Sequence, residues 1–167
     1  DKAKAELREH PELSQLKLLV IGDELTKHPD LRRAVVRTRV REDVRFLGFV
    51  PLPVLRVFYT RARAFLFPTE EDAGIAPIEA QACGTPVIAL GKGGVLDTVI
   101  EGKTGLFFAK QRSDHILEAL ARFAQHIFDP EEIRAHARQF SEERFRERLR
   151  AIVENAPPLR LSPLSPP

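Results

Sequence analysis

The 167-residue chain contains one cysteine, no methionine and no stretch that approaches 18 consecutive apolar residues. A single cysteine cannot form a disulfide within the chain, which fits the reducing cytoplasm, where we expect the protein to be located. The short apolar runs argue against a membrane-spanning helix in this sequence, and it shows no signal-peptide pattern. Because the sequence begins with Asp1 and has no Met, we expect it to be a fragment of a longer protein.

The chain also lacks an excess of charge of one sign. Its 26 basic and 24 acidic residues leave a net charge of +2, and Arg alternates with Glu across residues 142–150. This alternation is typical of a solvated helix face rather than of a nucleic-acid-binding surface. We therefore expect no nucleic-acid partner.

Patterns for metal binding and cysteine chemistry are missing as well. The five histidines occur without an H-x3-H pair and without a cysteine at ligand spacing. Cys83 stands beside Ala80 and Ala82 in a helix that we expect to be buried, so we interpret it as a core residue rather than a nucleophile. We expect no structural metal site.

Two common phosphate-binding motifs do not fit. Gly102-Lys103-Thr104 resembles the end of a P-loop, but Asp97 occupies the required earlier glycine position and the segment precedes a strand. The first expected strand ends at Gly22 without the G-x-G-x-x-G pattern. The sequence therefore predicts neither a P-loop site nor a dinucleotide site of the usual kind.

Apolar runs and helix signals alternate along the chain. We expect strands over residues 16–22, 44–47, 64–67, 86–90 and 105–108. We expect helices over 25–41, 52–63, 75–83, 113–126 and 141–154, a short helix ending at 100, and another starting at the Asp129-Pro130 cap. This alternation predicts an α/β fold, a Rossmann-like doubly wound parallel sheet with helices on both faces. Residues 1–155 would form one domain, followed by a Pro-rich, disordered tail over 156–167.

A glycine turn between two carboxylates follows the expected strand over 64–67. Gly74 allows a tight turn, and Pro77 suits the first turn of a helix. The first-turn amides of that helix would lie at the carboxyl end of the strand, where open α/β sheets bind ligands, and they would favour a phosphate. Glu71 and Glu79 cannot bind phosphate themselves, so we expect them to bind hydroxyl groups of a sugar or a ribose. This combination suggests a nucleotide-sugar ligand.

Several motifs keep the order found in one enzyme family. Glu71 and Glu79 enclose seven residues and are followed by Ala-Gln-Ala-Cys-Gly-Thr-Pro-Val-Ile-Ala at 80–89 and Gly-Lys-Gly-Gly-Val-Leu-Asp-Thr-Val-Ile at 91–100. This arrangement resembles the C-terminal, donor-binding half of the retaining GT-B glycosyltransferases of family four, with the mannosyltransferase-like branch nearest. Further segments keep the same order, at residues 20–23, 44–48, 102–108 and 140–145. The resemblance covers roughly residues 17–155.

The resemblance implies a role for each carboxylate. Glu79 would accept hydrogen bonds from the two ribose hydroxyls, and Glu71 would contact hydroxyls of the transferred sugar, so that these two residues are the catalytic candidates. The residues alone also allow plainer interpretations. Glu79 would then be favoured only by the dipole of its helix, and Glu71 would be an acidic residue of a surface loop.

The resemblance also implies three groups of donor-binding residues. First-turn amides of the helix over 75–83 would hold the pyrophosphate and stabilise the charge that grows on the leaving nucleoside diphosphate. The backbone over residues 46–50, at the end of the second strand, would frame the base, and a glycine loop would approach the site closely. The three groups are Gly74, Ile75 and Ala76; Phe46 and Gly48; and Gly93 and Gly94.

The implied reaction is transfer from a nucleoside-diphosphate sugar, GDP-mannose or a UDP-sugar, to a hydroxyl acceptor with retention of configuration and without a required metal or other cofactor. In the family, an Arg and a Lys before the first strand clamp the pyrophosphate, and residues 1–15 hold no counterpart. We therefore expect this chain to be inactive without an N-terminal acceptor domain. That domain would bind either a sugar acceptor or a lipid-linked acceptor. The kind of acceptor would also decide whether the parent protein associates peripherally with a membrane.

Two other functions remain open at this point. One is a non-catalytic module that binds a nucleotide-sugar or a phosphosugar, and the other is a structural Rossmann-like domain. The missing basic pair favours the binding module for this chain. The intact set of residues over 71–94 argues against the structural interpretation.

Overall fold

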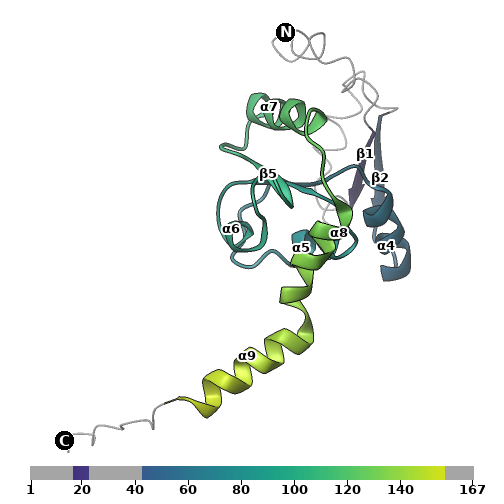
Figure 1. The fold of residues 1–167 in the computed structure, drawn as a ribbon. Helices are drawn as coiled ribbons and strands as arrows, with labels where there is room; N and C mark the ends of the chain where they lie inside the picture. The colour runs from purple at the N-terminus through teal and green to yellow at the C-terminus, as the bar shows by residue number, and fades with distance from the viewer. Residues whose placement is uncertain (1–16, 23–42, 157–167) are drawn as a thin grey trace, which may run out of the picture.

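The structure is a computed structural model that describes residues 17–22 and 43–156 (Figure 1). The expected helix over 25–41 and nearly all of the expected Pro-rich tail lie outside the described residues. No helix of the described part is long and apolar enough to cross a membrane.

Three parallel strands form the central sheet: β3 (Phe65–Phe67), β4 (Val87–Leu90) and β5 (Gly105–Phe108), in the order β3-β4-β5. Phe65 pairs with Val87, and Val87 pairs in turn with Gly105. All four residues of β4 are buried. This burial explains why β4 is a continuous apolar run rather than an alternating one, since a central parallel strand is covered on both faces.

A second parallel sheet contains only β1 (Leu18–Ile21) and β2 (Val44–Gly48). The α/β class with parallel strands and flanking helices is confirmed, but the described strands form two sheets rather than the one sheet that we expected. Leu18 and Leu19 are 45% and 40% exposed, so β1 lacks the two-sided cover that a strand inside a continuous parallel sheet receives.

The helices lie close to their expected bounds. They are α4 (Leu52–Arg61), α5 (Ile75–Ala82), α6 (Val95–Thr98), α7 (Ser113–Ala124), α8 (Pro130–Ala137), the 3-10 helix η2 (Arg138–Phe140) and α9 (Glu142–Glu154). Asp129 caps α8 by accepting a hydrogen bond from the Glu131 amide, as the sequence predicted. Ser141 caps α9 in the same way through the Arg144 amide.

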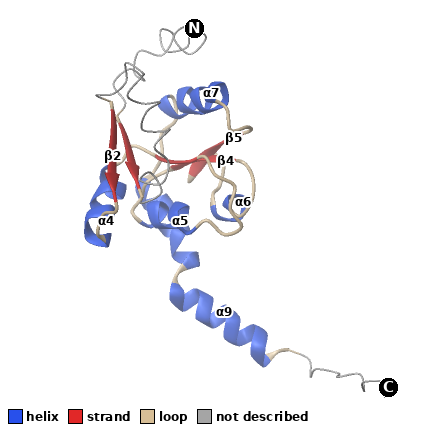
Figure 2. Ribbon diagram, turned by 180° about the vertical axis from the view of Figure 1, so that it is seen from behind, coloured by secondary structure: helices blue, strands red, loops and turns tan. Residues whose placement is uncertain are grey.

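Both faces of the three-stranded sheet are covered (Figures 1 and 2). One apolar cluster joins Phe67, Val87 and Ala89 to residues of α4, α5 and α6. The other joins Ile88, Leu90 and Phe108 to α7. Side chains alternate between these clusters along each strand, as the period of two requires. The sheet is therefore held between two helical layers, while α9 extends away from the body and buries none of its residues.

Candidate functional site

The site predicted from the sequence lies where β3 and β4 end. Both strands are parallel, so the loop after β3 (residues 68–74) and the loop after β4 (residues 91–94) leave the same edge of the sheet. The Gly94 amide donates a 2.8 Å hydrogen bond to the Glu71 carbonyl oxygen, and Lys92 Nζ lies 4.0 Å from Glu70 Oε2. The structure thus brings the carboxylate loop and the glycine loop together.

Glycine is required where the two loops meet. A Cβ atom on Gly94 would lie 2.2 Å from the Asp72 carbonyl oxygen, and one on Gly93 would lie 2.5 Å from the Glu71 carbonyl oxygen. Any larger residue would push the two backbones apart. The close approach that the sequence predicted for Gly93 and Gly94 is present, and its partner is the backbone beside Glu71.

Helix α5 begins without a side-chain cap. Gly74 stands at its N-cap with φ of 63°, a left-handed conformation that favours glycine, and it offers no side chain to the first-turn amides. The first turn also carries no acidic residue. The leading amides of a helix have no intrahelical acceptor, so those around Ile75 and Ala76 are available to an anion. Ile75 is exposed and Ala76 half-buried, whereas Gly74 is buried, so this end of the helix is accessible on its Ile75 side.

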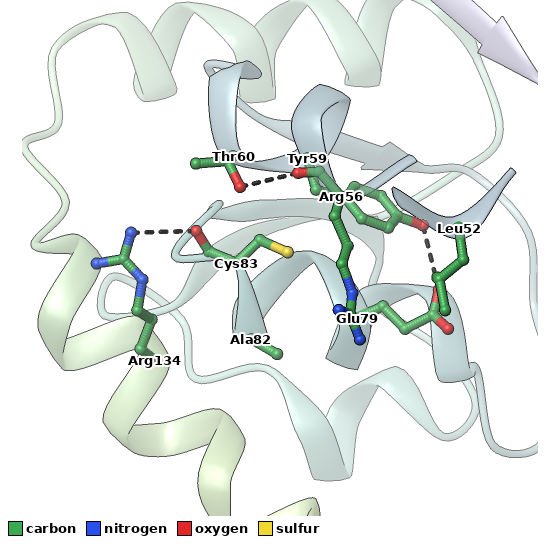
Figure 3. Close-up of a pocket in the computed structure, with 8 residues that line it drawn as sticks. All are labelled: Leu52, Arg56, Tyr59, Thr60, Glu79, Ala82, Cys83 and Arg134. Carbon is green, nitrogen blue, oxygen red and sulfur yellow. Dashed lines mark hydrogen bonds between the residues drawn. The ribbon is translucent and has the colours of Figure 1, made fainter. Parts of the chain in front are cut away.

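Glu79 lies on the second turn of α5 and faces α4 rather than the glycine loop. It lines a cavity of about 490 Å³ between the two helices, together with Leu52, Arg56, Tyr59, Thr60, Ala82, Cys83 and Arg134 (Figure 3). The Tyr59 hydroxyl lies 3.5 Å from Glu79 Oε2. Burial, followed by the negative charge of Glu79, raises the pKa of Tyr59 to about 12, so its hydroxyl keeps its proton at neutral pH.

Glu71 occupies a different setting. Its side chain is exposed in the loop before α5, where Oε1 accepts a 3.3 Å hydrogen bond from the Thr69 hydroxyl. Glu71 does not line the cavity that holds Glu79. The two carboxylates therefore occupy different settings, Glu71 in the exposed loop before α5 and Glu79 in the cavity beside α4.

Phe46 and Gly48 belong to the two-stranded sheet. The Gly48 carbonyl oxygen accepts a 3.0 Å hydrogen bond from Gly22, and neither predicted residue lines the cavity with Glu79. Among the described hydrogen bonds, none joins Phe46 or Gly48 to the loop before α5. No described hydrogen bond links these two residues to the rest of the predicted site, and their contact with a base stays a prediction.

Sequence reasoning missed Tyr59 and Arg134. Arg134 reaches from α8 to the Cys83 carbonyl oxygen at the end of α5, 3.2 Å from Nη2. Tyr59 is the only tyrosine of the chain, and a tyrosine hydroxyl that is buried usually has a polar partner nearby, which was the available signal. Cys83 is half-buried and packs against the apolar cluster of α4 and α5, as expected for a core residue.

Residues 17–22 and 43–156 contain no group of three or more His, Cys, Asp or Glu side chains that could hold a metal ion. Two of the histidines bond to backbone instead: His126 Nε2 lies 2.7 Å from the Gly102 carbonyl oxygen, and His136 Nε2 lies 3.1 Å from that of Thr98.

Comparison with known proteins places this geometry in a family context. A family model described as Glycosyl transferases group 1 matches residues 1–126. The D-inositol 3-phosphate glycosyltransferase of Kribbella flavida is 36% identical over 124 residues, which cover 71% of this chain and 29% of that protein. The protein of the same name from Actinosynnema mirum is 36% identical over 152 residues, covering 86% of this chain and 36% of that protein. The chain thus spans about a third of the length of these curated relatives.

Solved structures show the same fold. Sucrose-phosphate synthase from Thermosynechococcus elongatus matches with a TM-score of 0.63 and 30% identity, covering 88% of this chain and 36% of that one. Anabaena HepE in complex with UDP matches with a TM-score of 0.64 and 22% identity, covering 84% of this chain and 41% of that one.

Proposed function

Because the chain belongs to the glycosyl transferases group 1 family, we propose that it binds the nucleoside-diphosphate sugar donor of a retaining glycosyltransferase at the carboxyl edge of β3 and β4. The observation that carries this proposal is the start of α5. Gly74 opens the helix with no side-chain cap and no acidic residue in the first turn, directly beside the loop that Gly93 and Gly94 hold in place. An uncapped, accessible helix N-terminus of this kind favours a phosphate group.

The proposed donor lies along α5. Its pyrophosphate accepts hydrogen bonds from the amides of Gly74, Ile75 and Ala76, and its ribose donates to the carboxylate of Glu79. Glu71, in the exposed loop, contacts hydroxyls of the transferred sugar. A carboxylate suits both hydroxyl partners because it only accepts hydrogen bonds and does so at two oxygens.

The proposed chemistry needs little beyond binding and charge stabilisation from this chain. As the bond between the sugar and the diphosphate breaks, negative charge grows on the leaving group, and amide dipoles already aimed at it stabilise that charge. The acceptor hydroxyl is held by the remainder of the parent protein, which we place in the cytoplasm, and the isolated chain does not transfer sugar. We propose that donor binding requires no metal ion.

Donor identity is the finer part of the proposal. The two candidates are a UDP-sugar and GDP-mannose, and the names of the inositol-phosphate relatives specify an acceptor rather than a base. UDP is the first probe, because a solved structure of similar fold contains it.

The experiment is a calorimetric titration of the chain with UDP, GDP and their glucose and mannose conjugates in the presence of a chelator. We expect saturable binding of one nucleotide. Glu79→Gln should weaken that binding by about 1.5–3 kcal/mol, the typical value of hydrogen bonds to a charged group. The matched control is Glu118→Gln, because Glu118 is an exposed glutamate on α7, on the other face of the sheet from α5. This variant should bind the nucleotide as the wild type does. Equal affinity of the Glu79 variant and the control would contradict the ribose role.

A binding module without catalysis is the second candidate, because Lys2, Lys4 and Arg8 do not match the spacing of the family's Arg and Lys pair. The two functions differ once the chain is joined to the rest of its parent protein. Transfer of labelled sugar to any acceptor by that longer protein would exclude the module, whereas donor binding without transfer or hydrolysis would support it.

A further inference from the structure

Tyr59 and Glu79 meet across the interface of α4 and α5. The Tyr59 side chain is only 8% exposed, it stands in the last turns of α4, and its hydroxyl lies 3.5 Å from Glu79 Oε2. Figure 3 shows the ring and the carboxylate directed toward one another inside the cavity. The separation is longer than the roughly 2.5–3.0 Å typical of O–H···O hydrogen bonds and stands at the outer limit for such a contact.

Tyr59 is fixed at its backbone as well as at its ring. The Thr85 hydroxyl, buried two residues before β4, donates a hydrogen bond to the Tyr59 carbonyl oxygen. The Tyr59 ring packs edge-to-face against Phe65, with centroids 5.5 Å apart and an interplanar angle of 87°. These contacts tie the end of α4 to β3 and β4, so the hydroxyl approaches Glu79 from one fixed direction.

We propose that Tyr59 is a positioning residue that holds the Glu79 carboxylate in the orientation in which it receives the ribose hydroxyls. The inference rests on the proposed function, because it assigns Tyr59 an effect only through Glu79. One hydrogen bond from Tyr59 occupies one side of Oε2 and leaves Oε1 and the remaining acceptor positions to the two ribose hydroxyls. The phenol can do this throughout the physiological range, since burial and the Glu79 charge raise the pKa of Tyr59 to about 12.

The contact can be tested without any ligand. Because the chain has one tyrosine and no tryptophan, its phenolate absorbance reports Tyr59 alone. We expect spectrophotometric titration to give a lower pKa for Tyr59 in Glu79→Gln than in the wild type, because the substitution removes the carboxylate charge. Cys83, Arg56 and Arg134 also line the cavity and remain unchanged in this comparison. An identical pKa in the two proteins, with circular dichroism showing the fold kept over the titrated range, would overturn the contact.

The effect of the contact between Tyr59 and Glu79 on ligand binding is tested with UDP. The proteins compared are the wild type, Tyr59→Phe, Glu79→Gln and the double variant. Tyr59→Phe keeps the ring and its packing, and we expect it to weaken UDP about tenfold, with no further loss when Glu79 is already Gln. Equal melting temperatures of wild type and Tyr59→Phe would show that the fold is kept.

The outcomes separate the two proposals. If Glu79→Gln weakens UDP but Tyr59→Phe does not, or if the Tyr59 loss is the same in both backgrounds, the positioning role is wrong while the proposed function stands. If the wild type does not bind UDP or GDP, the proposed function fails, and the positioning role fails with it even where the phenol titration still shows the contact.

Discussion

Gly94 is the residue whose substitution tests the site most simply. Its φ of −63° is an ordinary helical value, so alanine there adds no backbone strain and differs only by a Cβ atom 2.2 Å from the Asp72 carbonyl oxygen. We expect Gly94→Ala to displace the loop that carries Glu71, to weaken UDP binding, and to lower the unfolding free energy by about 1–3 kcal/mol, as overpacking typically does. Calorimetry and urea denaturation measure the two effects.

Gly91→Ala is the control for that substitution. It lies in the same loop, and its Cβ atom would approach the Phe107 side chain at 3.3 Å rather than collide with backbone. We expect a smaller loss of stability and nearly unchanged UDP affinity. UDP binding that is equally strong in Gly94→Ala and the wild type would show that the approach of the two loops does not shape the site.

At the same scale, Glu79 and Tyr59 show what the sequence could and could not predict. Gly74 and Pro77 are local signals, and they were enough to place Glu79 on the second turn of a helix. Twenty positions separate Tyr59 from Glu79, and their contact depends on how α4 packs against α5. The sequence indicates that a lone tyrosine needs a polar partner, but the identity of that partner follows only from tertiary packing.

At the scale of elements, α8 and α9 carry similar caps but differ in burial. Ile133 and Ala137 of α8 are buried, whereas α9 buries none of its residues. We expect Asp129→Ala to lower the unfolding free energy by about 1 kcal/mol, because losing the cap destabilises a helix that belongs to the core. Ser141→Ala, the matched change at α9, should lower it much less, since α9 can fray without opening the core.

Urea denaturation of the two variants followed by circular dichroism measures the difference. Losses of equal size would mean that α9 unfolds together with the body of the protein, in contrast to its exposed position in the structure.

Element bounds were predictable where the chain carries local signals. The segment from α5 to β4 is the best example, since Gly74 begins the helix and Gly84-Thr85-Pro86 separates it from the strand. Strand pairing was less predictable, because β1 and β2 have the apolar character of sheet strands yet pair only with each other in the described structure. The choice of pairing partner depends on which strand edges meet when the chain packs. The period of apolar residues specifies which face of a strand is buried, but not which strand lies beside it.

At the scale of the whole molecule, the three-stranded sheet provides a rigid base for the proposed donor site. Helices cover both of its faces, so we propose that a ligand meets the sheet at the carboxyl edge, at the loops over 68–74 and 91–94. The chain spans about a third of the length of its curated relatives, and we propose that the acceptor and the closure over the donor come from the remainder. The expected organisation as one domain over residues 1–155 stays a prediction.

The most direct measurement of the central claim is an amide NMR titration of the nitrogen-labelled chain with UDP, repeated with GDP. The account predicts the largest shifts at the amides of Gly74, Ile75 and Ala76, with smaller ones at Gly93 and Gly94, for at least one of the nucleotides. Absence of shifts at millimolar nucleotide, or shifts confined to α7 on the opposite face of the sheet, would contradict it.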